Sequence, residues 1–569
     1  MQKQWIYPAQ ADNGLDRRLG EELNIPPVIA NILISRDIIT REQAVQFFTP
    51  KITDLHDPYL MKNMDVAIDR IQEALKSKEK ILIYGDYDVD GITACSLLYL
   101  YFKELTDQVH YFIPDRLKEG YGFSLRGVEE AQRLGVTLII TVDCAITANE
   151  EIAFAQEQGI DVIVTDHHEP GSTLPPAVAI LNPMQPDCPY PFKGLAGVGV
   201  AFKLVQGMTL SIGWDTGHLV PYTDLVAIGS AADIVPLVDE NRILVKEGIN
   251  RINERKNIGL NALLDVASLH NCFIGTGQIL FGIAPRINAV GRLGSAERAV
   301  SLFTTNDRIK VYEIARVLEE ENKHRKSIEE KTFNEAFSIA EEEFDPAASD
   351  PLVLADEDWH PGVIGIVASR LVDRFYRPSV MIALDEGIGK GSIRSVPDFD
   401  VFSALQKCSG YLKEFGGHKY AAGLTIEQDK LQDFKEAFKQ SVRDSITQDE
   451  LVPKLKIDAQ ISLDQIDERF YTILRHFAPF GLRNTRPIFV AENVEIVGTP
   501  LVVGKNHLKF SVRQNGDVFP AIAFNMGERI DQLEAGRSGC NIAFVIDENT
   551  WRGSTTLQLQ IKDLRQTLC

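Results

Sequence analysis

Three carboxylates at alternate positions, Asp86, Asp88 and Asp90, follow the apolar run Ile81–Tyr84 and precede Gly91. The run has the length and composition of a buried strand, and alternate residues leaving a strand end point the same way. At least two of these acids can therefore converge on one point, where their mutual repulsion requires a cation. Ligand sets made only of oxygen favour hard ions such as Mg²⁺ or Mn²⁺.

The same segment has two other interpretations. It could be a solvated acidic turn, and it also matches the first six positions of a calcium-binding loop. The calcium loop requires a Glu six positions after the glycine, and Leu97 stands there instead. The solvated turn stays open as the alternative to a metal site.

Similar acids recur after other apolar segments. Each one taken alone is more often a helix cap or a loop residue. Sites in doubly wound α/β sheets form at the carboxyl ends of parallel strands, so the joint pattern predicts a multi-acid metal site with an imidazole ligand. The residues are Asp143 after 138–142, Asp166, His167 and His168 after 161–165, and Asp233 beside a Gly/Ala-rich turn at 225–232.

The elements that position these residues belong to an α/β protein. We expect a leader of short helices and turns at 1–60, a parallel-sheet domain at 61–305, a connecting helix at 306–345, a smaller α/β domain at 346–450 and a β-rich module at 451–569. Strand and helix patterns alternate most clearly between 138 and 166, where a helix is expected at 149–158.

Residues 306–344 contain neither Gly nor Pro and are dense in Glu, Lys and Arg. This pattern predicts one helix of about 35 residues, which we interpret as a solvated spacer between two domains. The smaller α/β domain that follows has Gly-rich segments at 389–395 and 416–423, which carry Ser392, Arg394 and His418. They either bring backbone N–H groups to an anion or form tight turns.

The last part of the chain contains about five short β-rich runs, at 501–503, 508–513, 519–524, 542–546 and 555–561. Such runs separated by turn signals predict a small barrel, with an oligonucleotide-binding (OB) fold as the leading candidate. A sandwich with a protein-binding role is the alternative. Six residues could provide positive charge and aromatic surface for binding single-stranded nucleic acid: Lys505, His507, Lys509, Arg513, Trp551 and Arg552.

Composition is that of an ordinary globular chain, with 44% hydrophobic and 24% charged residues. The net charge of −21 argues against general phosphate binding. The part from Leu451 onward nevertheless has 14 Lys and Arg against 13 Asp and Glu, which is compatible with local DNA-binding patches.

No apolar run reaches the length of a membrane span, and the first five residues do not resemble a secretory signal. The seven cysteines are dispersed, and none forms a C-x-x-C pair. These features indicate a cytoplasmic protein without a disulfide framework.

Several motifs resemble, in order, those of the DHH phosphoesterases: Asp86–Gly91, Thr141–Cys144, Asp166–His168 and Gly229–Asp233. Further motifs narrow the resemblance to the RecJ family of exonucleases specific for single-stranded DNA: Pro285–Ala289 with Gly291-Arg292, Gly416–His418 with Ala421–Gly423, Phe480–Asn484 and Gly504–Lys509. The resemblance extends over nearly the whole chain.

The resemblance implies a DHH domain, a DHHA1 domain and an OB fold. It also implies a processive exonuclease that degrades single-stranded DNA from 5′ to 3′, releases 5′-mononucleotides and serves DNA repair and recombination. Its cofactors would be Mn²⁺ or Mg²⁺, with two ions. By analogy, the metal ligands are Asp88, Asp90, Asp143, His167 and Asp233, with Asp90 or Asp143 bridging.

Other roles follow from the same resemblance. Asp86, Asp166 and His168 would lie among or beside the metal ligands and act in catalysis. His168 would position the phosphate or orient another ligand. The expected DNA-binding residues, several of which would hold the 5′-phosphate, are Arg116, Arg286, Asn288, Ser392, Arg394, His418, Lys505 and Lys509.

One position departs from the family pattern. Where the family has Asp-Cys-Gly after the second strand, this chain has Asp143-Cys144-Ala145. If that position has a positive φ, Ala145 is strained there.

Three other functions fit part of the sequence. A small-substrate DHH enzyme, such as an oligoribonuclease, a cyclic-dinucleotide phosphodiesterase or a manganese pyrophosphatase, would share the metal residues but not need the barrel. A non-catalytic scaffold would not need the complete ligand set. A nucleic-acid-binding module could hold metal without using it for catalysis. Single-stranded DNA is the expected substrate, single-strand-binding protein and a RecQ-type helicase are expected partners, and a monomer is expected.

Overall fold

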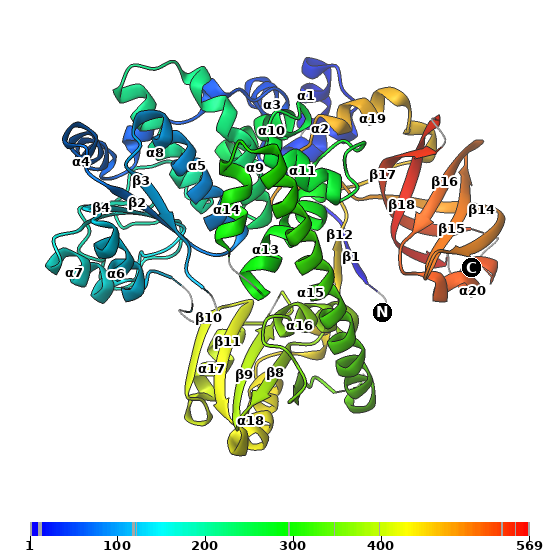
Figure 1. The fold of residues 1–569 in the computed structure, drawn as a ribbon. Helices are drawn as coiled ribbons and strands as arrows, with labels where there is room; N and C mark the ends of the chain where they lie inside the picture. Colours follow the sequence, from blue (N-terminus) through cyan, green and yellow to red (C-terminus); the bar gives the residue numbers. More distant parts are fainter. Residues whose placement is uncertain are drawn as a thin grey trace. The chain divides into compact units, whose positions relative to one another are not determined.

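The computed structural model describes residues 3–8, 14–115, 120, 122–293, 296–345, 348–397, 399–535, 539–551 and 554–566. The chain divides into two compact units (Figure 1). The smaller unit comprises Met1–Ile6 and Glu320–Leu455, and the larger comprises Tyr7–Glu319 and Lys456–Cys569. Within the described residues, no helix combines the length and the apolar composition that a membrane span requires.

The larger unit contains the expected parallel sheet. Its strand order is β3 (Val109–Phe112), β2 (Ile81–Gly85), β4 (Leu138–Val142), β5 (Asp161–Thr165) and β6 (Ala179–Leu181), and every neighbouring pair is parallel. All residues of β2 and β4 are buried. Strands that are covered on both faces consist of continuous apolar residues, and these apolar runs allowed both strands to be predicted from the sequence.

Helices cover both faces of this sheet (Figure 1). One face packs in a hydrophobic core with α5 (Val89–Leu105) and α8 (Gly197–Ser211), and the other packs with α6 (Leu125–Leu134) and α7 (Asn149–Glu157). The larger core also includes α4 (Met64–Ser77), α10 (Asp239–Asn253), α11 (Ile258–Val266) and α14 (Glu297–Thr304).

The segment before Asp233 is a helix, α9 (Thr223–Ala232), and the expectation of a Gly/Ala-rich turn there was wrong. Nearly all of its residues are buried, so the sequence has no polar face that would reveal the helical period. Gly229 allows α9 to approach α5 closely, because a Cβ at this position would lie 2.8 Å from Oδ1 of Asp90.

The connecting helix exists as α15 (Arg308–Glu343) and has 36 residues. The interpretation of a solvated spacer was wrong, because both of its ends are packed. Val311, Ala315 and Leu318 join the core of the larger unit, and Ala336 and Ala340 join a core of the smaller unit.

The smaller unit contains a mixed sheet with the order β10 (Glu414–His418), β11 (Ala421–Glu427), β9 (Ile388–Arg394), β8 (Ser379–Asp385) and β7 (Leu352–Asp356). Helices α16 (Ile364–Phe375), α17 (Val401–Lys407) and α18 (Leu431–Arg443) complete it. The first Gly-rich segment lies in strand β9 and is not a tight turn, whereas the second forms the β10–β11 hairpin and contains a two-residue tight turn at 419–420. At Gly391 a Cβ would lie 2.7 Å from Leu424, so side-chain packing explains this glycine.

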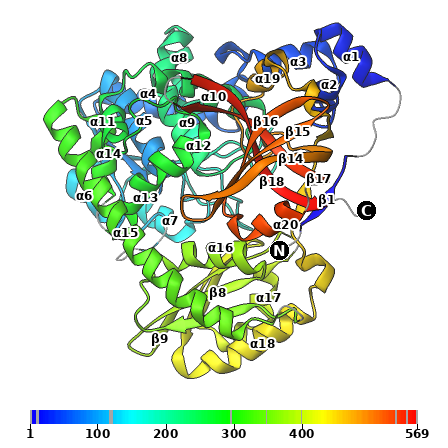
Figure 2. The ribbon, with the colours of Figure 1, turned by 90° about the vertical axis from the view of Figure 1, so that its right-hand side faces the viewer.

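The C-terminal module is a closed barrel, which confirms the OB fold over the sandwich (Figure 2). Its strands are β14 (Phe489–Val503), β15 (His507–Gln514), β16 (Asp517–Ala523), β18 (Ser554–Gln566) and β17 (Cys540–Trp551), and β17 pairs with β14 to close the sheet. The expected run at 501–503 is only the end of β14. A short strand, β13 (Ala459–Gln460), pairs with β14.

The N-terminal helices α1 (Leu15–Leu23), α2 (Pro27–Ile34) and α3 (Arg41–Phe48) share a hydrophobic core with the barrel and with α19 (Glu468–Arg475). Buried Arg242 of α10 ties this region to the sheet domain, since it donates hydrogen bonds to backbone carbonyls on both sides. They belong to Phe47, His476, Phe477 and Ala478, at 2.8 to 3.1 Å. A short pairing of β1 (Gln4–Ile6) with β12 (Lys454–Lys456) also joins distant segments.

Ala145 lies in the turn after β4 with a φ of 84°, as the departure from the family motif suggested. Its residue type is unfavourable there, because a Cβ makes left-handed backbone costly. We expect Ala145→Gly to raise the free energy of unfolding by about 1 kcal/mol, measured by denaturant titration. Ala155→Gly in the middle of α7 should instead lower it by about 1 kcal/mol or more. Equal destabilisation by both variants would contradict strain at Ala145.

Candidate metal centre

The first acidic motif forms the turn between β2 and α5. Asp88 is the N-cap of α5, and its Oδ1 accepts hydrogen bonds from the N–H groups of Asp90 and Gly91 at 2.9 and 3.1 Å. This cap fixes the turn, and Asp86 and Asp90 are buried within it. The alternating acids therefore follow a strand end as expected, and the last of them starts a helix.

Asp90 is held by a second helix. Its two carboxylate oxygens accept hydrogen bonds from the N–H groups of Gly197 and Val198, at 2.6 and 2.9 Å, at the start of α8. The positive end of a helix dipole stabilises a carboxylate at this position. These two residues were not among the candidates from the sequence, although the run Gly194–Gly199, with three glycines, indicates close backbone approach.

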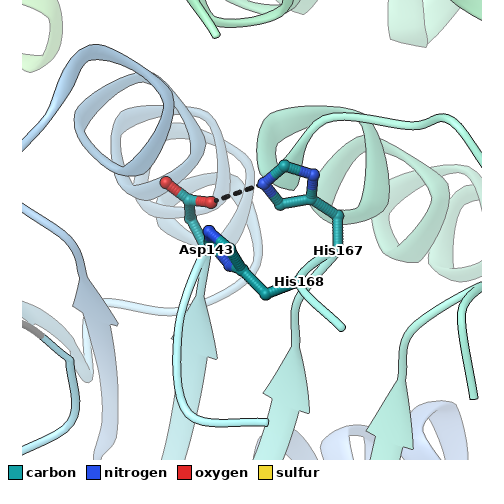
Figure 3. A group of neighbouring side chains, drawn as sticks. All are labelled: Asp143, His167 and His168. Atoms are coloured by element: carbon teal, nitrogen blue, oxygen red, sulfur yellow. Dashed lines mark ion pairs between the residues drawn. The ribbon is translucent and has the colours of Figure 1, made fainter. Parts of the chain in front are cut away.

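Asp143 and His167 come from the ends of the neighbouring strands β4 and β5 and point toward each other (Figure 3). Nε2 of His167 lies 3.2 Å from Oδ1 of Asp143, 3.6 Å from Oδ2 of Asp233 and 3.9 Å from Oδ2 of Asp90. Asp233 reaches this point from the C-terminal end of α9. Gly197 leaves room for the cluster, since a Cβ there would lie 2.6 Å from Oδ1 of Asp143.

Ligand atoms gather in three groups, and the atoms of each group lie within 4.8 Å of one another. The first is Asp90, His167 and Asp233, the second is Asp86, Asp88 and Asp143, and the third is Asp143, His167 and His168. Asp143 and His167 each belong to two of these groups, and Asp90 belongs to one. Asp143 joins Asp86 and Asp88 in the second group and lies 3.2 Å from His167, a member of the first, so the geometry favours Asp143 over Asp90 as a ligand shared by two cations.

Asp166 anchors the two histidines. Its carboxylate accepts hydrogen bonds from the N–H groups of His167 and Ile146, at 2.7 and 3.0 Å, and Nδ1 of His168 lies 2.7 Å from its Oδ1. Burial alone would raise the pKa of Asp166, but the hydrogen bond and charge of His168, together with backbone hydrogen bonds from His168 and Ile146, outweigh burial and hold this pKa below its usual value. Asp166 is therefore suited to orienting His168.

The electrostatics of the cluster fit a cation. Burial and the nearby carboxylates raise the pKa of Asp90 and Asp143, and burial and Asp88 raise that of Asp233 to about 7. Burial, together with His168, lowers the pKa of His167 to about 4, so its ring is neutral and able to act as a ligand. Oδ1 of Asp143 and Nε2 of His167 are buried without a hydrogen-bond partner. A divalent cation would satisfy both atoms.

The next motif lies on α13 (Ala284–Leu293), which approaches the acidic turn. A Cβ at Gly291 would lie 2.6 Å from the carbonyl oxygen of Tyr87, so the glycine allows this contact. Arg286 is buried and forms an ion pair of 2.6 Å with Glu319 of α15, while Asn288 is half-buried. Arg116 lies outside the described residues.

Three expected DNA-binding residues lie in the smaller unit. Ser392 and Arg394 on β9 face the start of α16, where a Cβ at Gly365 would lie 2.9 and 3.1 Å from their polar atoms. Arg394 also donates a hydrogen bond of 3.1 Å to Oγ of Ser392. An arginine, a hydroxyl and a helix N-terminus together suit a phosphate. His418 is exposed at the end of β10.

The barrel carries the remaining candidates. Lys505 and Lys509 are exposed, whereas Arg513 is paired with Glu495 at 2.6 Å. Phe524 was not among the candidates from the sequence; it is 44% exposed, and its ring forms an edge-to-face contact with the ring of His507, with the centroids 5.1 Å apart. The side chain of Trp551 and all of Arg552 lie outside the described residues.

Comparisons with known proteins agree with this architecture. The chain matches the DHH family N-terminal domain over residues 80–230, the DHHA1 domain over 349–444 and the RecJ OB domain over 457–563.

Two curated relatives are named single-stranded-DNA-specific exonuclease RecJ. The Bacillus subtilis protein is 38% identical over 96% of this chain and 69% of its own length. The Haemophilus influenzae protein is 34% identical over 95% of this chain and 97% of its own length. Among solved structures, Thermus thermophilus RecJ in complex with Mn²⁺ aligns with a TM-score of 0.85 and 30% identity, over 100% of this chain and 80% of that one. The chain therefore belongs to the RecJ family.

Proposed function

We propose that this chain is a metal-dependent exonuclease that degrades single-stranded DNA processively from the 5′ end and releases 5′-mononucleotides. The relatives' names support the substrate and the reaction class. The observation that carries the proposal is the convergence of the acids and His167 at the carboxyl edge of the sheet, with Asp143 common to two ligand groups.

The cofactor is Mn²⁺ or Mg²⁺, the ions present in the related Thermus thermophilus structures. Asp90, His167 and Asp233 would hold one ion, Asp86 and Asp88 would hold a second, and Asp143 would contribute to both. When bound, two such ions would supply an activated water and would stabilise the attacking and leaving oxygens of a phosphodiester. The helix N-termini of α5 and α8 hold Asp88 and Asp90 in place for this purpose.

Residues beside the ligands position the scissile phosphate. Asp166 fixes the ring of His168 through its Nδ1 side, and we assign His168 to the scissile phosphate. We assign Asn288 and Arg286 on α13 to the DNA backbone next to the metal centre, with Glu319 fixing Arg286. His418 and Arg116 stay predictions from the family resemblance.

Strand polarity requires a site that recognises a 5′-phosphate. We assign this role to Ser392, Arg394 and the start of α16, because they combine a bidentate cation, a hydroxyl donor and a helix N-terminus. On the barrel, Lys505 and Lys509 would contact phosphates and Phe524 would stack against a base.

None of the three alternative functions gains a specific observation. A small-substrate phosphodiesterase does not need the barrel, and a scaffold does not need the complete ligand set. Four further properties are predictions from the family resemblance. They are action in DNA repair and recombination, a cytoplasmic location, a monomeric state, and contacts with single-strand-binding protein or a RecQ-type helicase.

Digestion of matched oligonucleotides labelled at the 5′ or the 3′ end tests the function. With Mn²⁺, we expect the 5′ label to be released at once as a mononucleotide, while the 3′ label stays on progressively shorter strands. Double-stranded DNA and reactions with a chelator should show no digestion. Release of the 3′ label first, or cleavage of short oligomers only, would contradict the proposal.

Asp143→Asn should weaken Mn²⁺ binding at least tenfold and abolish hydrolysis, because the shared ligand loses its charge. Isothermal titration calorimetry and the digestion assay measure the two effects. Asp187→Asn is a matched control, since Asp187 also has a positive φ (60°) but is exposed in a loop. Mn²⁺ binding that both variants retain would remove Asp143 from the ligand set.

Arg394→Ala should reduce the preference for a 5′-phosphate over a 5′-hydroxyl about tenfold, because a charge-assisted hydrogen bond is lost. Competition between the two strands in the digestion assay measures this preference, and calorimetry should find Mn²⁺ binding unchanged. Arg443→Ala, which removes an exposed arginine paired with Asp350 on the same unit, should leave the preference intact. A preference unaffected by Arg394→Ala would place the 5′-phosphate elsewhere.

A further inference from the structure

The start of α10 contains three consecutive polar residues that are almost completely buried, Glu240, Asn241 and Arg242. Burial of a polar side chain costs free energy unless hydrogen bonds replace those that it made with water. Lys203 of α8 offsets this cost for Glu240 at 2.9 Å, and Arg242 donates to backbone carbonyls of the segment 476–478. Asn241 lies between these two residues, and its contacts lead to the metal centre.

The amide group of Asn241 is a double donor. Its Nδ2 donates hydrogen bonds to the carbonyl oxygens of Gly194 and Pro236, at 2.5 and 3.1 Å. Its buried Oδ1 meets no hydrogen-bond donor among the described residues. Because an acceptor without a partner is unfavourable in a buried place, an apolar side chain of similar shape would suit packing better. The two donated bonds therefore explain why an asparagine stands here.

The two carbonyl groups belong to segments that lead to the metal centre. Gly194 lies three residues before α8, whose first N–H groups hold the carboxylate of Asp90. Pro236 lies three residues after Asp233. The two segments are in contact, since a Cβ at Gly194 would lie 3.6 Å from Cγ of Pro236. One side chain thus joins the backbone that holds Asp90 to the backbone that carries Asp233.

Asp90 and Asp233 need this connection because their carboxylates repel each other. Together with His167 they form one ligand group, whose atoms lie within 4.8 Å of one another. Two negative charges at such a separation in a buried place destabilise each other unless a cation binds between them. The separation of the two carboxylates without the cation is therefore set by the backbone that carries them.

The backbone that follows Asp233 is not in a relaxed conformation. Ile234 has a φ of 59°, which is unfavourable for a β-branched residue and persists only where surrounding contacts impose it. The N–H group of Leu237 donates to the carbonyl of Leu482 at 2.8 Å. Asn241 holds the same segment one residue nearer to the ligand, at the carbonyl of Pro236.

We propose that Asn241 is a positioning residue of the metal centre, which fixes the separation of Asp90 and Asp233 so that one divalent cation fits between them and His167. Asn241 acts through the backbone of the two segments and not as a ligand. The inference rests on the proposed function, because it takes the assignment of these three ligands from it.

Calorimetric titration of the full chain with Mn²⁺, without DNA, tests this role. The parent should bind two ions, and Asp233→Asn identifies the ion that depends on this ligand group. Asn241→Leu, which removes both donors, should weaken the same ion about tenfold and change the other less than about twofold. In the digestion assay, the Mn²⁺ concentration for half-maximal rate should rise about tenfold, while the rate at saturating Mn²⁺ returns to near that of the parent.

Asn253 provides a matched control on the same helix. Its Nδ2 also donates to two backbone carbonyls, those of Ile249 and Ile274, at 2.7 and 2.9 Å. Both carbonyls lie far in sequence from the metal ligands. Asn253→Leu should therefore lower the melting temperature, as Asn241→Leu does, and leave both Mn²⁺ affinities unchanged.

Asn241→Ser keeps the test decisive if the leucine variant does not fold. The serine hydroxyl retains one donor in a smaller side chain, so we expect a smaller loss of affinity for the same ion. Circular dichroism and the melting temperature in a chelator show whether each variant is folded. An affinity of the serine variant equal to that of the parent for both ions would contradict the role of Asn241.

The outcomes separate this inference from the proposed function. A folded Asn241→Leu protein that binds both ions as the parent does would show that Asn241 only stabilises the fold, and equal weakening of both ions would also overturn the inference. If Asp233→Asn leaves Mn²⁺ binding unchanged, the ligand assignment fails and the inference with it. If the parent binds Mn²⁺ but digests no DNA, the proposed activity fails, while selective weakening in Asn241→Leu would still support the positioning role.

Discussion

The structure depends on holding several carboxylates together in a buried place where they repel one another. Asp90 and Asp143 lie almost completely out of solvent within reach of Asp233. Removing carboxylates from water costs several kcal/mol for each group. The two helix N-termini at α5 and α8 offset part of this cost through backbone hydrogen bonds, and a bound cation would offset the rest.

Local patterns were sufficient to predict much of the fold. Strands β2, β4 and β5 are apolar runs buried on both faces, and α15 lacks helix-breaking residues over its whole length. The metal-centre candidates were predictable for the same reason, since Asp86, Asp143 and His167 each follow a recognisable strand. Even the strained position of Ala145 followed from one departure in a motif.

Other features depend on contacts that a sequence window does not contain. The buried helix α9 has no polar face, and strand β9 looks like a turn because its glycines, Gly389 and Gly391, are explained by packing against distant side chains. Gly197 and Val198 hold Asp90 from more than a hundred residues away. The ion pair of Arg286 with Glu319 likewise requires the helix packing to be known first.

The shared core of the N-terminal helices and the barrel affects how the protein folds during synthesis. Leu19, Ile29 and Leu33 are synthesised more than 400 residues before their partners Phe470, Phe489 and Phe544. At 5 to 20 residues per second, the early helices wait on the order of tens of seconds with apolar faces uncovered. Such an interval gives chaperones that bind exposed apolar segments time to act, and it makes synthesis of the barrel decisive for the stability of helices α1 to α3.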